Sequence, residues 1–221
     1  MSILELYEKY RIMPQLAEHQ FKVAGVAKLV CDNLEQDLDR DNIVEACLLH
    51  DIGNIIKFDL SVTDKLLPGR FSPEDLAVWQ GVKDEFVSKY GKDEHHATIR
   101  IIREIGVSQR VVELVDCIGF HNGKSNAESR DWGKEICAYS DMRVGPGGVI
   151  SLEQRFQDLR VRYDHKHRLM GGNEDLRLEF EAGLRQIEKQ LFEKCRIKPE
   201  EITEEKVLAK TESLKNFEIK L

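Results

Sequence analysis

Apolar positions recur at steps of three and four residues along most of the chain, which is the period of an α-helix with one buried face. The stretch 14–34 is the clearest case, and its apolar face carries Leu16, His19, Val23, Val26, Ala27 and Val30. No alternation of apolar and polar residues extends beyond a few positions, so β-strands are not indicated. The pattern therefore predicts an all-α fold.

Capping residues and helix breakers place the remaining helices. Asp39 or Asp41 can cap a helix that runs through His50. The segment 72–75 (Ser-Pro-Glu-Asp) combines a cap, a proline at the first helical position and acidic residues, and its helix should end near Gly91. Further helices are expected over residues 93–105, 108–118 and 130–143, with a loop over residues 121–129.

The character of the chain changes after Gly148, where charged residues become frequent. We interpret residues 1–148 as the main domain and residues 149–221 as a charged C-terminal helical extension that packs on it. Helices are expected over 151–170 and 174–195. The second should contact the main domain through an apolar stripe of Leu176, Phe180, Leu184, Ile187 and Leu191. A role as a dimerisation arm is the alternative, and a homodimer stays open.

Composition narrows the classes of function. The 221 residues are 41% hydrophobic and 33% charged, as in folded soluble domains, and the net charge of −7 disfavours binding to a nucleic-acid polymer. No apolar run is long enough for a membrane span, and the first residues do not resemble a secretion signal. The five cysteines are odd in number and widely spaced, which is typical of reduced thiols, so we expect a cytoplasmic protein.

Candidate chemistry lies in histidines and aspartates at helix faces and ends. His19 and His50 share the apolar faces of two expected helices, Asp51 follows His50, and Asp141 ends a third apolar helix. A single buried histidine is usually structural, but the ordered set supplies two imidazoles and two carboxylates that could bind one ion together. Such a mixed nitrogen and oxygen site suits a divalent ion: manganese, iron, cobalt, magnesium or nickel. Gly53 would let the chain turn sharply after the pair.

This order, H…HD…D, resembles the HD-domain superfamily of metal-dependent phosphohydrolases. The resemblance covers residues 14–145, and its motifs here are EHQFKVAGVAKLV, ACLLHDIGN and CAYSDMRVGP. It implies an HD-domain-like helical bundle in which His19, His50, Asp51 and Asp141 bind metal. Many members read HDIGK, whereas this chain has Asn54 at the last position, and Lys57 one turn later is a candidate replacement.

Some members of the superfamily hold a second ion through two more histidines. The candidates here are His95 or His96, together with His121. Helical phase favours His95, because it shares a face with Ile99 and Ile102, whereas His96 shares one with Arg100 and Arg103. One ion and two ions both remain open. The last two histidines, His165 and His167, are expected at the surface.

The resemblance implies cleavage of a phosphoester or phosphoanhydride bond in a nucleotide or a related small phosphate by metal-activated water. Asp51 would bridge ions or lie beside the attacking water, and cationic side chains would stabilise the phosphate oxygens. The candidate cations are Lys57, Arg70, Arg100, Lys124 and Arg143. Of these, Arg143 is the favoured one, since it lies two residues after Asp141. A di-iron oxygenase of the same fold and a non-catalytic module that binds a nucleotide or a partner are the alternatives.

Overall fold

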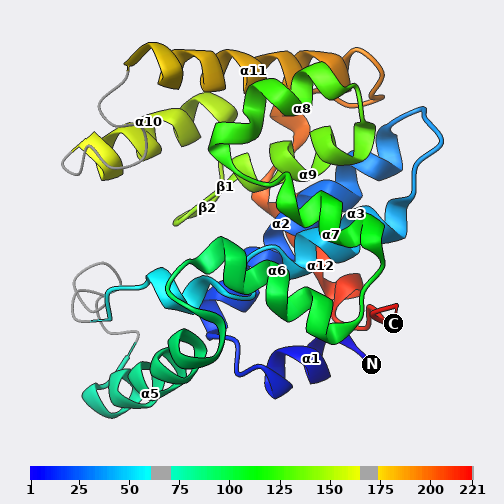
Figure 1. Cartoon of the computed structure of the whole chain (residues 1–221). Coiled ribbons are helices and arrows are strands. Elements are labelled where there is room, and N and C mark those ends of the chain that lie inside the picture. The colour runs from blue at the N-terminus through cyan, green and yellow to red at the C-terminus, as the bar shows by residue number, and fades with distance from the viewer. Residues whose placement is uncertain (61–70, 165–173, 221) are drawn as a thin grey trace.

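The computed structural model describes residues 1–60, 71–164 and 174–220, and these confirm the prediction of an all-α fold (Figure 1). A short hairpin with two residues in each strand, β1 (Val144–Gly145) and β2 (Gly148–Val149), accompanies the helices. The α-helices are α1 (Ile3–Lys9), α2 (Pro14–Asn33), α3 (Arg40–Leu49), α5 (Pro73–Tyr90), α6 (Glu94–Ile105), α7 (Gln109–Asp116), α8 (Gly123–Ser129), α9 (Trp132–Met142), α10 (Leu152–Asp164), α11 (Glu174–Phe192) and α12 (Glu204–Leu214). Short 3₁₀ turns are η1 (Asn54–Lys57), η2 (Phe120–Asn122) and η3 (Pro199–Glu201).

Helix α2 runs through the centre of the molecule and packs against α3, α9 and α12 (Figure 1). Its apolar residues are buried on more than one side, as Val23, Val26 and Val30 show with no exposed surface. The approach of α12 is close, because a Cβ atom on Gly25 would lie 3.0 Å from a methyl carbon of Val207. Since α2 carries His19, this packing fixes one wall of the candidate site.

The caps expected from the sequence are present. Asp39 caps α3, Ser72 forms a reciprocal capping box at the start of α5, and Asp93 and Ser108 cap α6 and α7. Helix α6 ends at Gly106 in the left-handed conformation, with φ at 93°. Local side-chain chemistry therefore sets these boundaries.

The expected loop over residues 121–129 is wrong, since η2 and helix α8 occupy this stretch. The reason lies in its packing against α11. A Cβ atom on Gly183 of α11 would lie 2.4 Å from the backbone nitrogen of Lys124, so the two helices cross with almost no space between their backbones. A seven-residue helix with few apolar side chains is unstable alone, and tertiary contact stabilises it.

The C-terminal helices pack on the rest of the bundle: α11 contacts α8 and α9, and α12 contacts α2. Within the expected stripe of α11, Leu184, Ile187 and Leu191 are fully buried, and Leu176 and Phe180 are partly exposed. The expected helix over 151–170 is seen as α10 to Asp164, and its remainder lies outside the described residues. None of the described helices is long and apolar enough to cross a membrane.

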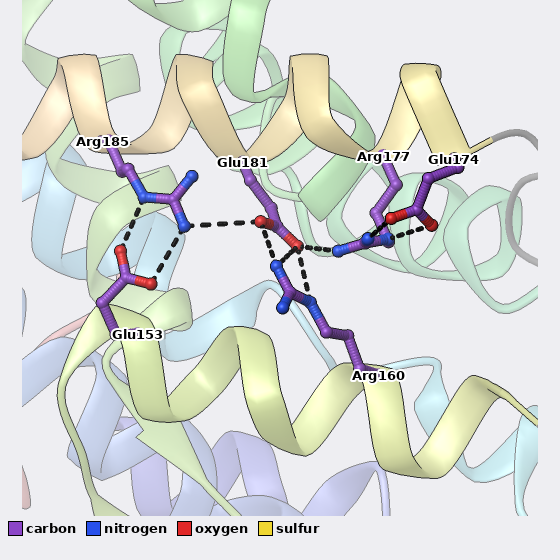
Figure 2. A network of polar contacts seen from close by, with 6 residues as sticks. All are labelled: Glu153, Arg160, Glu174, Arg177, Glu181 and Arg185. Atoms are coloured by element: carbon purple, nitrogen blue, oxygen red, sulfur yellow. Dashed lines mark hydrogen bonds and ion pairs between the residues drawn. The ribbon is translucent and has the colours of Figure 1, made fainter.

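Helix α10 is tied to α11 by a network of charges around a buried carboxylate (Figure 2). Its members are Glu153, Arg160, Glu174, Arg177, Glu181 and Arg185. Glu181 has a side chain that is only 1% exposed, and it accepts hydrogen bonds from Arg160 at 2.6 Å and from Arg185 at 3.4 Å. Arg185 also pairs with Glu153 at 2.6 Å. Two residues of α10, Glu153 and Arg160, are therefore joined to α11 by arginine–carboxylate pairs.

Removal of this carboxylate should loosen the α10–α11 pair. We expect Glu181→Ala to lower the free energy of unfolding by about 2 kcal/mol, because it leaves arginines facing one another without their buried counter-charge. Glu179→Ala is the matched control, since Glu179 is 42% exposed and pairs with Lys124 at the surface, where a pair contributes less than about 1 kcal/mol. Urea unfolding measures both variants. Equal losses would contradict the role of the buried network.

Glu135 on α9 is a second buried carboxylate, and it makes stability depend on pH. Burial raises its pKa to about 7, Asp131 adds to the rise, and Arg130 opposes it. The folded protein therefore holds the proton up to about pH 7, and the stability that this provides is lost as the pH rises through that pKa. We expect Glu135→Gln to raise the free energy of unfolding near pH 8 by about 2 kcal/mol and to change it little near pH 4. A gain that does not vary with pH would contradict this origin.

Candidate metal centre

Four polar side chains, carried by α2, α9 and the end of α3, lie close together. His19 comes from α2, His50 and Asp51 follow the last residue of α3, and Asp141 lies in the last turn of α9. Asp141 Oδ1 is 3.3 Å from His19 Nε2 and 3.5 Å from His50 Nε2. The carboxylate of Asp51 approaches each imidazole to 3.7 Å. Residues up to 122 positions apart in sequence therefore share one point in space.

The protonation of His50 suits a metal ligand. Its Nδ1 lies 2.8 Å from the carbonyl oxygen of Cys47. A carbonyl only accepts hydrogen bonds, so Nδ1 carries a proton, and Nε2 is the ring nitrogen that faces the site, where a bound ion would take the place of a proton. Nε2 is buried and has no hydrogen-bond partner in the described part of the chain. A buried nitrogen of this kind, aimed at carboxylates, is the arrangement in which an imidazole binds a divalent cation.

The spacing of the donors also fits an ion. One donor atom each from His19, His50 and Asp141 lies within 4.8 Å of the others. Imidazole nitrogens and carboxylate oxygens bind divalent ions at about 2.1 Å, so donors about 3.0–3.4 Å apart can share one ion. The 3.3 Å between His19 Nε2 and Asp141 Oδ1 falls in this range, and the 3.5 Å between His50 Nε2 and Asp141 Oδ1 lies just above it. The donor set is therefore compatible with a divalent metal.

The charges of the site reinforce one another. Burial alone would raise the pKa of Asp141, but the close contacts with the imidazoles of His19 and His50 outweigh it and hold that pKa well below its usual range. Burial would lower the pKa of His50, and the charges of Asp51 and Asp141 raise it instead to about 9. The carboxylates thus attract positive charge strongly, which a divalent ion would satisfy.

The site is open on one side. The side chains of His19, Asp51 and Asp141 keep 22%, 21% and 18% of their surface exposed, whereas that of His50 keeps 3%. His50 therefore forms the floor, and the other three form a rim that water and a small ligand can reach.

The HD-domain family profile matches residues 16–156, which includes all four residues of the site. The chain belongs to the HD-domain family. No curated protein and no solved structure gives a significant match. The family is one of metal-dependent phosphohydrolases, so the family match and the geometry of the donors agree.

The HD turn, residues 48–53, is held in place by polar residues that the sequence did not single out. Gln20 Oε1 accepts a hydrogen bond from the backbone N–H of Asp51 at 3.3 Å, and Thr98 Oγ1 accepts one from Gly53 N–H at 3.1 Å. The sequence could have pointed to Gln20, because it is a polar residue on the buried face of an apolar helix. The sequence gives no indication of the role of Thr98, because its partner is 45 residues away.

Gly53 is required by close approach and not by its conformation. Its φ of −92° is one that any residue adopts, so the expected conformational freedom is not the reason for glycine here. A Cβ atom on Gly53 would lie 2.8 Å from the backbone nitrogen of Thr98 and 2.9 Å from the carbonyl oxygen of Glu94. The HD turn therefore rests directly on the backbone of α6.

The histidines expected to hold a second ion lie outside the group of His19, His50 and Asp141. His95 Nε2 is 2.9 Å from Asp116 Oδ1, a partner that the sequence did not indicate. Burial lowers the pKa of His121, the charge of His95 lowers it further, and Asp116 opposes both. His96 is 80% exposed, against 41% for His95. The ligand role of His95 and His121 stays a prediction, and His165 and His167 lie outside the described residues.

Arg143 was expected to contact phosphate, but the structure shows its side chain bound to other groups. The side chain is buried, and its guanidinium donates hydrogen bonds to the carbonyl oxygens of Ile150 at 2.6 Å, Pro199 at 3.2 Å and Ile202 at 3.3 Å. It also donates to the hydroxyl of Tyr139. Arg143 thus attaches the C-terminal segment to α9, and its long-range partners explain why proximity to Asp141 in sequence was misleading.

Among the other candidate cations, Lys57 has a charge that acts on the site. Its ammonium is exposed and helps to lower the pKa of Asp51, after the opposing effect of burial and the larger effect of His50. Lys124 pairs with Glu179 of α11, and the guanidinium of Arg100 lies over the ring of Tyr90 at 5.7 Å. Arg70 lies outside the described residues.

Proposed function

We propose that this HD-domain protein hydrolyses a phosphoester or phosphoanhydride bond of a nucleotide or a related small phosphate. The observation that carries the proposal is the convergence of His19, His50, Asp51 and Asp141 on one open-sided point within an HD domain. These residues would hold a divalent ion: manganese, iron, cobalt, magnesium or nickel. When bound, such an ion neutralises phosphate charge and lowers the pKa of water toward neutrality.

Asp51 is the residue that we assign to the attacking water. Its carboxylate lies on the rim of the site, 21% exposed, and the net effect of His50, Lys57 and His19 against burial lowers its pKa. Asp51 is therefore ionised at neutral pH and accepts a hydrogen bond from water, which orients the water toward phosphorus.

Lys57 is the residue that we assign to the phosphate. It follows the HD turn in η1, is exposed, and has a charge that helps to lower the pKa of Asp51. An ammonium at this position offers a mobile positive charge to phosphate oxygens. It takes the role that a lysine at the position of Asn54 would have in HDIGK members.

The number of ions remains to be decided between one and two. One ion is supported by the group of His19, His50 and Asp141. A second ion would require His95 and His121 to bind it, with His95 giving up or sharing its contact with Asp116. Measurement of metal per chain after loading with Mn²⁺ and gel filtration distinguishes the two arrangements.

We also infer a small substrate and an intracellular setting. The net charge of −7 repels long polyanions, whereas a single ion can hold one phosphate group. All five cysteines are free thiols, which agrees with a reducing cytoplasm.

The test is a hydrolysis assay that measures both released phosphate and, by chromatography, cleaved nucleotide, with Mn²⁺-loaded protein on nucleoside mono-, di- and triphosphates and on phosphodiesters. We expect turnover of at least one class, which EDTA abolishes and Mn²⁺ restores. Protein that binds Mn²⁺ but cleaves none of these compounds would contradict the proposal. Oxygen consumption by iron-loaded protein would support the oxygenase instead, and nucleotide binding without turnover would support the regulatory module.

A further inference from the structure

The end of helix α3 contains an exchange of hydrogen-bond partners. In a continuing α-helix, the carbonyl of Cys47 would accept from the N–H of Asp51, four residues later. Here that carbonyl lies 2.8 Å from Nδ1 of His50. The N–H of Asp51 donates instead to Oε1 of Gln20, at 3.3 Å. The hydrogen bond that sets the His50 tautomer thus occupies the carbonyl of Cys47, which the N–H of Asp51 would otherwise use. Gln20 of α2 supplies another acceptor for that N–H.

Gln20 is an unusual residue for its position. It is fully buried in α2, among apolar residues, immediately after His19. Its Nε2 has no hydrogen-bond partner within the described residues, which costs folding free energy. An apolar residue would fill this place without that cost. Among the residues that the structure describes, its side chain makes a polar contact only with the backbone of Asp51, 31 residues away.

We propose that Gln20 is a positioning residue for Asp51. Consecutive residues of a helix point about 100° apart, so α2 directs His19 to the donor group and Gln20 to the HD turn. One rigid helix thereby fixes both a ligand and the backbone that carries a second carboxylate, and it sets the 3.7 Å separation of His19 Nε2 and Asp51 Oδ2. The effect on metal binding is independent of the reaction, whereas the effect on turnover rests on the proposed function.

Three variants test this assignment. Gln20→Met keeps the length of the side chain and removes the acceptor, and Gln20→Glu keeps an oxygen at the same place. Gln190→Met is the matched control, because Gln190 also makes one hydrogen bond to a backbone group, with Ala127 at 3.3 Å, and has one buried unpartnered atom. The measurements are amide exchange of Asp51 by NMR in metal-free protein, Mn²⁺ affinity by calorimetry, and kcat and KM.

We expect Gln20→Met to speed the exchange of the Asp51 amide at least about tenfold and to weaken Mn²⁺ binding about tenfold, as loss of a ligand-orienting contact does. Its kcat should fall more than its KM changes, whereas Gln190→Met should match the wild type in all three. Gln20→Glu should keep the exchange of the Asp51 amide within about threefold of the wild type.

Three results would overturn the proposal: wild-type exchange and Mn²⁺ affinity in Gln20→Met, equal losses in Gln190→Met, or rapid exchange of the Asp51 amide in Gln20→Glu. If Gln20→Met does not fold, the Gln20→Glu result alone decides. A wild-type protein that binds Mn²⁺ without hydrolysing phosphates would refute the proposed function only, because exchange and affinity still report on Gln20.

Discussion

Replacement of Asp141 by asparagine should weaken Mn²⁺ binding at least about a hundredfold and lower phosphate release by a similar factor or more. Asp141 Oδ1 lies closest to both imidazole nitrogens, at 3.3 Å from His19 and 3.5 Å from His50. The amide of asparagine has nearly the same shape but no charge, so the substitution removes a ligand anion without opening a cavity. Calorimetry with Mn²⁺ and the hydrolysis assay measure the two effects.

The control for Asp141→Asn is Asp32→Asn. Asp32 lies on the same central helix as His19, is partly exposed, and pairs with Lys210 at 2.8 Å, away from the donor group. We expect this variant to keep Mn²⁺ affinity and turnover within about threefold of the wild type. Folded Asp141→Asn protein, shown by circular dichroism, that binds Mn²⁺ normally would refute the metal centre.

Introduction of a single methyl group at Gly53 should be nearly as damaging to the site. In Gly53→Ala the new carbon would lie under 3.0 Å from two backbone atoms of α6, which cannot move aside as a flexible side chain does. We expect a loss of about 3 kcal/mol in the free energy of unfolding and a weaker affinity for Mn²⁺, because the HD turn must shift. Urea unfolding and calorimetry give these two quantities.

Gly81→Ala is the matched control for this substitution. Gly81 lies within α5, and a Cβ atom there would meet nothing within 4 Å. Alanine stabilises the interior of a helix relative to glycine, so this variant should gain about 0.5–1 kcal/mol and bind Mn²⁺ normally. A Gly53→Ala protein as stable as the wild type would show that α6 does not confine the turn.

The sequence predicts a helix boundary correctly where neighbouring residues alone determine it. Asp39, Ser72 and Asp93 each cap the next helix with their own side chain, so their sequence context was sufficient. Helix α8 was not predictable in this way, since its stability comes from α11, about 60 residues later, through glycines whose spacing carries no periodic signal. The tertiary partner outweighed local preference there.

The same distinction holds for the candidate site. His19, His50, Asp51 and Asp141 could be selected because ligands at helix faces and ends leave an ordered pattern of residue types. Arg143 could not be assigned correctly, because its acceptors are main-chain carbonyls, which every residue possesses. The contact of Asp116 with His95 could not be predicted either, since an exposed aspartate on the polar face of an amphipathic helix is ordinary.

The donors of the candidate metal centre lie in α2, just after α3, and in α9, so they are spread over residues 19–141 of the chain. An early folding product that lacks α9 therefore has no Asp141 to contribute, and the donor group is complete only after α9 has packed against α2 and α3. Occupancy then reports on completed assembly. Substitutions far from the histidines that loosen α2, α3 or α9 should show up first as protein purified with too little metal, before any unfolding is detected.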